Sequence, residues 1–263
     1  MDRIVRELFC RTGASRGPGR LCLMLDFDGT LSEMAPTPEK ARFYPPSRRA
    51  LDELSRLPGV TVALVSGRDV SDLRRKAGLG RAVYCGNHGL ELPGFRLPAD
   101  VEAAKKAFRR SSLPALRLLR EISSRYPGSR IQRKRFSISL HYRALRPVAA
   151  LAMERELGEA ARALARMPGV RTGAGKKVLE VKAKADFHKG AACRLILERR
   201  GGAGLYMGDD VTDEDAFRSL RGRAVTVFVG PRSRRTAAMR RVPDPRSAAA
   251  LLEKILEAAG RGG

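Results

Sequence analysis

The stretch LCLMLDFDGTL, residues 21–31, gives the clearest indication of the fold. Its first five residues are all apolar, which is typical of a strand buried on both faces of a parallel sheet. Asp26 and Asp28 follow at once, and Gly29 and Thr30 let the backbone turn tightly over a small ligand. Two carboxylates at this spacing repel each other, so the sequence predicts a positive partner for them.

Apolar runs and amphipathic segments alternate on both sides of a central stretch. Besides 21–25, strands are expected at 60–65, 82–85, 204–207 and 224–229, and helices at 45–59, 70–78, 189–200, 213–220 and 247–260. Repeated β-α-β units predict a parallel sheet with helices on both faces. We therefore expect an α/β fold with a doubly wound, mostly parallel, Rossmann-like sheet.

The central stretch follows a different pattern. The segment RFSISLHYR, residues 135–143, alternates apolar and polar side chains, and so does KVLEVKAK, residues 177–184. One apolar and one polar face suit an antiparallel sheet with helices on one side only. Helices are expected at 100–125 and 147–166.

This change of pattern predicts two domains. The core comprises residues 1–92 and 184–263, and an α+β domain of residues 93–183 is inserted into it. A chain of 263 residues with 43% apolar residues is long enough to bury a core in each. The tract RTGASRGPGR, residues 11–20, is expected to be a loop.

The charge of the chain limits the classes of function that are expected. The chain holds 52 Lys and Arg against 28 Asp and Glu, a net charge of +24. These basic residues are spread along the whole chain, without interleaved aromatic residues or the spacing of a helix-turn-helix or zinc finger, so no specific nucleic-acid function is predicted. A basic nucleic-acid-binding protein remains the rival from another class.

The four cysteines show no CxxC spacing, which favours buried free thiols. No apolar run approaches the ~20 residues of a membrane span, and no signal-peptide pattern is present. We therefore expect a soluble protein of the cytoplasm that works as a monomer and has no membrane partner.

A second acidic cluster, MGDDVTDEDAF, occupies residues 207–217. Thr212 and Asp215 fit a capping box, which explains the acids of the first helical turn locally. Asp209 and Asp210 need another explanation, because they follow a strand and a glycine. Two acid pairs at two strand ends of one sheet indicate a hard divalent cation such as Mg²⁺. The acids that this spacing assigns to the metal are Asp26, Asp28, Asp209 and Asp210.

Three further residues suit a phosphate group. Ser66 follows the second strand directly, and the backbone N–H groups beside Gly67 can cradle an anion. Lys189 begins a helix, where a cation opposes the helix dipole unless it meets an anion. Because parallel strands present their carboxyl ends at one edge, these residues are expected to share a site with the acids.

Together these residues predict one class of reaction. One carboxylate attacks phosphorus to give an aspartyl-phosphate, and a second protonates the leaving alcohol and then activates water. We assign the attack to Asp26, which lies nearest the strand, and the proton transfers to Asp28. Lys189 and Ser66 neutralise and bind the phosphate.

The order of D-x-D-G-T, a strand-ending Ser, a Lys and GDDxxD resembles the haloacid dehalogenase superfamily of phosphatases. The resemblance implies the roles already given to Asp26, Asp28, Ser66 and Lys189, with Asp209 as the main late metal residue and Asp210 and Asp213 supporting it. It also implies that the insert is a C2-type cap, which covers the site and selects the substrate.

The finer resemblance is to trehalose-6-phosphate phosphatases. It rests on LDFDGTL, VSGR, GNHGLEL (86–92), SLHYR (139–143), KKVLEVK (176–182), HKGAA (188–192) and GDDVTDEDAF (208–217). The resemblance implies hydrolysis of trehalose 6-phosphate, and a sugar-binding surface that contains His88, Lys134, His141, Glu180 and Lys182. For the cap residues, the alternative is a solvent-exposed polar face.

One departure affects the substrate. Gln132 stands where the family often has an acid, which would weaken a sugar contact or change the preferred sugar. A phosphatase of the same architecture that acts on sucrose phosphate or a glycosyl-glycerate phosphate is therefore the nearest alternative.

Overall fold

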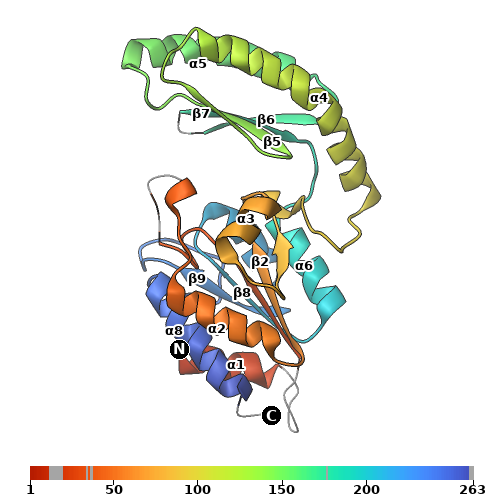
Figure 1. The fold of residues 1–263 in the computed structure, drawn as a ribbon, viewed down its shortest axis with the longest axis vertical. Coiled ribbons are helices and arrows are strands. Elements are labelled where there is room, and N and C mark those ends of the chain that lie inside the picture. The colour runs from red at the N-terminus through yellow and green to blue at the C-terminus, as the bar shows by residue number, and fades with distance from the viewer. Residues whose placement is uncertain (12–19, 34, 36–37, 176, 261–263) are drawn as a thin grey trace. The chain divides into compact units, whose positions relative to one another are not determined.

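The structure is a computed structural model that describes residues 1–11, 20–33, 35, 38–175 and 177–260. It divides into two compact units, Met1–Gly94 with Phe187–Gly263, and Phe95–Asp186 (Figure 1). The first unit thus ends its opening segment at residue 94, against the 92 expected, and the second ends at 186, against 183. Most of the predicted loop 11–20 lies outside the described residues.

The first unit is built on one sheet of six parallel strands. They are β1 (Leu21–Leu25), β2 (Val60–Val65), β3 (Val83–Cys85), β8 (Ala203–Gly208), β9 (Ala224–Val229) and β10 (Arg240–Val242). The order is β10-β9-β8-β1-β2-β3, with every neighbouring pair parallel. The predicted doubly wound parallel sheet is confirmed.

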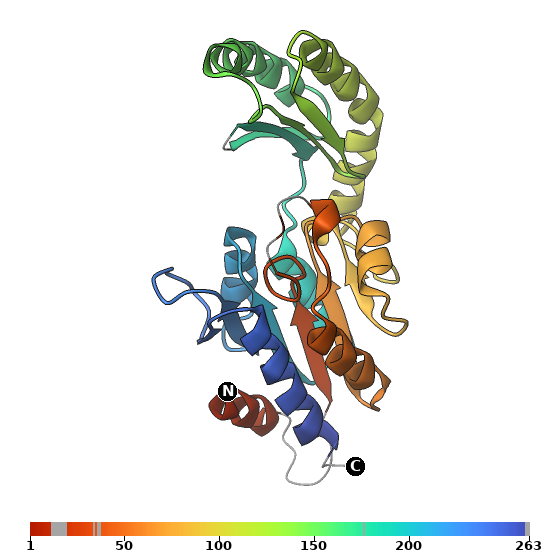
Figure 2. The same cartoon turned by 60° about the vertical axis from the view of Figure 1, so that its left-hand side comes forward.

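Helices cover both faces of this sheet (Figure 2). They are α1 (Asp2–Cys10), α2 (Pro45–Arg56), α3 (Val70–Ala77), α6 (Lys189–Arg200), α7 (Glu214–Ser219) and α8 (Pro245–Gly260). The helices α1, α2 and α8 contact one another or the strands on one face, and α6 contacts β1 and β2 from the other. Alternate residues of β1 serve the two faces: Leu23 joins the aliphatic core beneath α2 and α8, and Met24 points the opposite way.

The second unit is an antiparallel sheet with two long helices. Its elements are α4 (Ala99–Ser124), β4 (Arg130–Arg133), β5 (Ser137–His141), α5 (Pro147–Ala165), β6 (Val170–Gly175) and β7 (Val178–Ala183). The strand order is β4-β5-β7-β6. Ile138, Leu140, Leu179 and Val181 are buried, and both helices contact these strands. The predicted α+β character, with one apolar and one polar face, is confirmed.

The structure contains several elements that the sequence did not predict. These are α1, β4, β6, β10 and three single-turn 3₁₀ helices at Pro38–Lys40, Asn87–Gly89 and Val211–Asp213. Within the described part of the chain, no helix combines the length and apolar character that crossing a bilayer requires.

Candidate active site

The site lies where the strand order of the first unit reverses. From β1 the chain continues through β2 to β3 on one side, while β8, β9 and β10 extend the sheet on the other. The register pairs Leu25 with both Leu64 and Met207, so residues that follow these strands emerge at one level. Such a switch point at the carboxyl ends of strands is where open α/β sheets bind ligands. Asp26, Ser66 and Asp209 all emerge there.

The acidic loop after β1 is held by its backbone and by one aromatic anchor. The N–H of Asp26 donates to the carbonyl of Met207 at 2.9 Å, and the carbonyl of Phe27 accepts from the N–H groups of Leu31 and Ser32, each at 3.0 Å. The Phe27 ring is fully buried and packs edge-on against Phe43. The backbone between the two acids is therefore fixed.

Gly29 has two independent reasons to be glycine. Its φ of +81° lies in the region that side chains disfavour, and a Cβ there would stand 2.2 Å from Oδ2 of Asp209. The turn after the first acid pair thus fits directly under a carboxylate of the second cluster.

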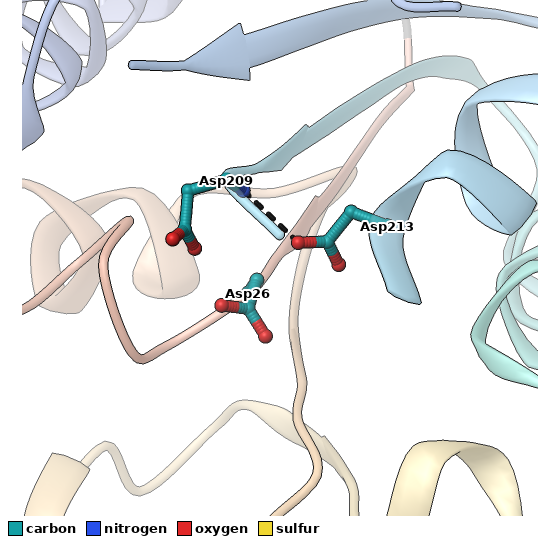
Figure 3. A group of neighbouring side chains, drawn as sticks. All are labelled: Asp26, Asp209 and Asp213. Atoms are coloured by element: carbon teal, nitrogen blue, oxygen red, sulfur yellow. Dashed lines mark hydrogen bonds between the residues drawn. The ribbon is translucent and has the colours of Figure 1, made fainter. Parts of the chain in front are cut away.

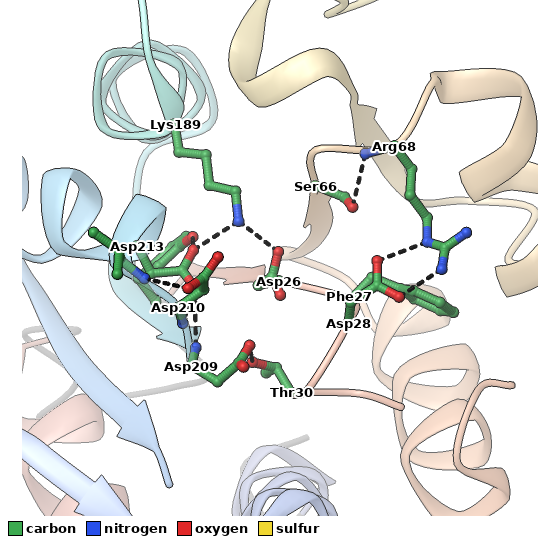
Figure 4. Close-up of polar contacts among 12 residues, drawn as sticks. Asp26, Phe27, Asp28, Thr30, Ser66, Arg68, Lys189, Asp209, Asp210 and Asp213 are labelled. Carbon is green, nitrogen blue, oxygen red and sulfur yellow. Dashed lines mark hydrogen bonds and ion pairs between the residues drawn. The ribbon is translucent and has the colours of Figure 1, made fainter. Parts of the chain in front are cut away.

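Lys189 joins the two acid clusters. Its Nζ donates to Oδ1 of Asp26 at 2.6 Å and to Oδ1 of Asp213 at 2.8 Å (Figure 4). The three side chains are 3%, 5% and 0% exposed, respectively. Although burial opposes it, the charges of Asp26 and Asp213 raise the pKa of Lys189, so the amine stays cationic.

Asp213 organises the segment after β8. Its Oδ1 accepts from Lys189 and from the hydroxyl of Tyr206 at 2.6 Å, and its Oδ2 accepts from the backbone N–H groups of Asp209 and Asp210, each at 2.9 Å. These four donors occupy the roughly four acceptor positions of a carboxylate. The capping box here joins Asp210 and Asp213, so the expected box of Thr212 and Asp215 is wrong.

Three carboxylates form a group that could hold a metal ion. One oxygen each from Asp26, Asp209 and Asp213 lies within 4.8 Å of the others (Figure 3). Burial, with the charges of Asp213 and Asp209 adding to it, raises the pKa of Asp26 well above its usual range despite Lys189. Burial and Asp213 raise the pKa of Asp209 to about 7. Three acids face one lysine, so the group lacks positive charge.

The two remaining acids predicted as metal residues lie outside this group. Asp210 caps the 3₁₀ turn, and its side chain is 62% exposed beside Arg234. Asp28 lies beside Arg68, whose Nε and Nη2 donate to its two oxygens at 2.7 and 2.6 Å. The positive partner of the opening acid pair is therefore divided: Lys189 serves Asp26, and Arg68 serves Asp28.

Ser66, Gly67 and His88 come together beside the acids. The Ser66 Oγ is buried and accepts from the N–H of Arg68 at 3.2 Å, and the carbonyl of Ser66 accepts from the N–H of His88 at 3.0 Å. A Cβ on Gly67 would lie 2.5 Å from the His88 imidazole. Asn87 and His88 both have positive φ, at 49° and 55°, and the Asn87 amide donates to Asp69 at 2.5 Å. This strained turn places His88 over Gly67.

The other predicted sugar-facing residues lie on the second unit. Lys134 is in the β4–β5 turn, where its N–H donates to the carbonyl of Ser137 at 2.8 Å. Glu180 and Lys182 of β7 form an ion pair at 3.2 Å with both side chains about half-exposed. Burial, then the charge of Arg130, lowers the pKa of His141, and its buried Nε2 has no hydrogen-bond partner among the described residues.

The family model for trehalose-phosphatase matches residues 24–246, which include most of both units. This chain belongs to the trehalose-phosphatase family.

Individual relatives agree with this family. A trehalose-phosphate phosphatase of Mycobacterium avium (strain 104) is 35% identical over 256 residues, which cover 91% of this chain and 63% of the relative. The chain thus spans less than two thirds of that relative's length. The C-terminal domain of a C. albicans trehalose-6-phosphate phosphatase has the same fold, with a TM-score of 0.74, 24% identity and 97% of each chain covered.

A haloacid dehalogenase-like hydrolase from Bacteroides thetaiotaomicron is also similar in fold. Its TM-score is 0.60 at 14% identity, and the match covers 90% of this chain and 99% of that one. This chain therefore shares the fold of a haloacid dehalogenase-like hydrolase, with the second unit inserted between β3 and α6.

Two arginines of this candidate site received no role from the sequence. Arg68 follows the strand-ending Ser by two residues, which is the signal that could have found it. Arg234 donates from Nη1 to the carbonyl of Asp209 at 2.7 Å, and its guanidinium lies over the Phe228 ring, 5.4 Å from the centroid. Nothing near Arg234 in the sequence distinguishes it from the many other arginines.

Proposed function

We propose that the protein hydrolyses trehalose 6-phosphate to trehalose and phosphate through an aspartyl-phosphate intermediate. The observation that carries the proposal is the buried Asp26 carboxylate at the end of β1, held from one oxygen by Lys189. A carboxylate with one oxygen fixed and the other accepting no bond from a described residue suits nucleophilic attack. Membership of the trehalose-phosphatase family supports the substrate.

In the first step, an oxygen of Asp26 attacks phosphorus and the bond between phosphorus and the sugar oxygen breaks. Asp28, in its acid form, gives its proton to the departing sugar oxygen. Lys189 and the Ser66 hydroxyl bind the phosphate oxygens, and the backbone N–H groups beside Gly67 help to cradle them.

In the second step, Asp28 accepts a proton from water as that water attacks the phosphorus of the aspartyl-phosphate. The bond between phosphorus and the Asp26 oxygen breaks, phosphate leaves, and both acids return to their starting states. The fixed backbone between Asp26 and Asp28 keeps the nucleophile and the proton carrier in register for both steps.

We further propose Mg²⁺ as the cofactor, held by Asp26 and Asp209. The residues fit: Oδ2 of each accepts no hydrogen bond from a described residue, whereas the acceptor positions of Asp213 are occupied. Mg²⁺ prefers a few carboxylates together with water and phosphate oxygens, and when bound it neutralises charge on the phosphate. Asp213 then acts by holding Lys189 and the Asp209 backbone.

The second unit is proposed to select the sugar. Its polar sheet face carries Ser139 directly opposite Glu180, with His141 and Lys182 on the same face. A disaccharide needs many hydrogen-bonding groups, and this face supplies donors and acceptors of both charges. The free state of Cys22, Cys85 and Cys193 suits a reducing cytoplasm, where we propose that the protein works as a monomer.

The test is phosphate release from trehalose 6-phosphate against a panel that includes sucrose 6-phosphate and glycosyl-glycerate phosphate, with and without Mg²⁺. We expect trehalose 6-phosphate to have the highest kcat/KM and EDTA to abolish turnover. Comparable kcat/KM for several sugar phosphates would contradict the trehalose assignment but retain the phosphatase. No release from any ester would contradict the phosphatase itself.

A further inference from the structure

The Arg68 guanidinium is buried, which is uncommon for a charge. Its side chain is 7% exposed, and it follows β2 in the loop that leads to α3. Removing a guanidinium from water is costly unless it is fully paired. The partners that Arg68 finds therefore show why it lies there.

Two carboxylates meet Arg68. Nε and Nη2 donate to the two oxygens of Asp28 at 2.7 and 2.6 Å (Figure 4). Nη1 donates to Asp72 of α3 at 2.7 Å. The guanidinium carbon also lies 5.4 Å from the centroid of the Phe27 ring, between the two acids of the loop. Although burial opposes it, the hydrogen bonds to Asp28 and Asp72 raise the pKa of Arg68.

The pairing with Asp28 fixes the orientation of its carboxylate. Two parallel N–H···O bonds hold the carboxylate in the plane of the guanidinium, which a single contact cannot do. Each carboxylate oxygen has two lone pairs, so the pairing leaves one on each for a proton. The Asp28 side chain is 42% exposed and therefore reachable from solvent, unlike Asp26.

The two acids of the loop are thus held by two different cations with different geometry. Lys189 binds one oxygen of Asp26 as a point charge and leaves the other available. Arg68 binds both oxygens of Asp28 and is itself anchored on Asp72 and Phe27. The guanidinium fork of Arg68, its Nε–H and Nη2–H pair, therefore fixes the orientation of the Asp28 carboxylate. The single ammonium contact of Lys189 does not fix the orientation of the Asp26 carboxylate in this way.

We propose that Arg68 is the positioning residue for Asp28: its fork aims the Asp28 carboxylate for the proton transfers of both steps. The proposal rests on the proposed function, because it assigns Arg68 to the acid and base work given there to Asp28. It predicts that Arg68 acts only through Asp28, and that a cation without the fork cannot replace it.

The test is a double-mutant cycle on the full chain with Arg68→Gln, Asp28→Asn and the double variant, measured as kcat and KM for trehalose 6-phosphate with Mg²⁺. We expect Arg68→Gln to lower kcat ~10²-fold, the order that misplacement of a reacting group costs, with KM within about threefold. In the Asp28→Asn background the same change should lower kcat less than about threefold further.

Arg68→Lys and Asp72→Asn are the matched controls. Arg68→Lys keeps the charge without the fork, and we expect kcat to remain at least ~10-fold below that of the unchanged protein. Asp72→Asn removes the anchor but leaves the pair with Asp28, so kcat should fall less than Arg68→Gln lowers it. Urea unfolding of each variant identifies any that fails to fold, and the cycle is then built on Arg68→Lys.

The possible outcomes separate the two proposals. Independent, multiplicative losses in the cycle, or full activity of Arg68→Lys, would overturn the positioning role while the phosphatase stands. An unchanged protein that releases no phosphate from trehalose 6-phosphate contradicts the proposed substrate, and the cycle is then measured on whichever ester of the panel is hydrolysed.

Discussion

The polar groups of the two units differ in their burial and in the number of hydrogen bonds that hold them. In the first unit, Asp26, Lys189 and Asp213 are nearly inaccessible, and Asp213 alone receives four hydrogen bonds. On the second unit, Glu180 and Lys182 are about half-exposed and hold each other through one contact of 3.2 Å. The first set is held by contacts among buried groups, whereas the second set keeps most of its hydrogen-bonding capacity for other partners.

This difference indicates that the polar groups of the first unit have fixed geometry, whereas those of the second unit can change partners. A buried network leaves each group one geometry, because an unpaired charge at low dielectric is costly. A half-exposed pair gains little from its own contact and exchanges partners cheaply. We therefore expect changes in the first unit to affect kcat and folding, and changes on the second unit to affect mainly KM.

Asp26→Asn should give the largest effect. The amide is a poor nucleophile, so we expect kcat on trehalose 6-phosphate to fall at least ~10³-fold. Asp215→Asn, at an exposed acid of α7, is the matched control and should stay within about threefold. Steady-state kinetics measures both, and full activity of Asp26→Asn would show that another group attacks phosphorus.

Asp213→Ala should cost the most stability. It leaves the Tyr206 hydroxyl and two backbone N–H groups without their acceptor and unbalances Lys189, for which we expect a loss of about 3 kcal/mol in the free energy of unfolding. Glu180→Ala on the second unit should cost less than about 1 kcal/mol. Equal losses in urea unfolding would remove the contrast between the units.

Stability of the metal-free protein should depend on pH through Asp209. Its pKa of about 7, against 3.8 for the ordinary group, means that the folded state retains a proton that the unfolded chain has already lost between these values. The free energy of unfolding should therefore fall as pH rises, by about 2 kcal/mol between about pH 5 and about pH 7.

Asp209→Asn should reduce that fall, because the amide carries no titrating proton. Saturating Mg²⁺ should reduce it as well, because the ion stabilises the charged form. Chemical denaturation at several pH values with EDTA measures the effect. A slope that Asp209→Asn leaves unchanged would assign the titration to another group.

Glu180→Gln should give the smallest effect, and it tests whether a change on the second unit affects KM rather than kcat. We expect KM for trehalose 6-phosphate to rise ~10-fold, because a charged hydrogen bond to a hydroxyl is lost, with kcat within about threefold. Glu121→Gln on α4, an exposed acid away from the polar sheet face, is the control. A fall in kcat with unchanged KM would place Glu180 in the chemical steps.

Most of the parallel sheet could be predicted because its buried strands are continuous apolar runs. The run 21–25 and the run 224–229 match β1 and β9 residue for residue. The strands that escaped prediction have other character. β4 reads RIQR and β6 reads VRTGAG at the two edges of their sheet, and β10 reads RRV at the edge of the other sheet. Edge strands bury little and tolerate charge, so hydrophobic pattern does not mark them.

The sequence predicted which residues meet at the candidate site better than it predicted the hydrogen bonds among them. Strand ends and spacing brought Asp26, Ser66, Lys189 and Asp209 to one edge, because parallel topology converts position after a strand into proximity. The roles within the second acidic cluster were not predicted: Asp213 was expected to be a first-turn helix acid and, by the resemblance, a supporting metal residue, but its buried carboxylate receives four hydrogen bonds. Which of several neighbouring acids turns inward depends on the 3₁₀ turn after β8, and sequence spacing does not encode it.

The insertion of the second unit has a consequence for biosynthesis. Asp26 and its partner Lys189 are 163 residues apart, and β1 lies between β2 and β8. At about 5–20 residues per second, a ribosome delivers Lys189 about 8 to 33 s after Asp26. Throughout that interval the nascent chain carries a fully apolar strand with at least one unpaired edge, which invites pairing with other chains. Yield in cells should therefore depend on chaperones that hold the first 94 residues until β8 emerges.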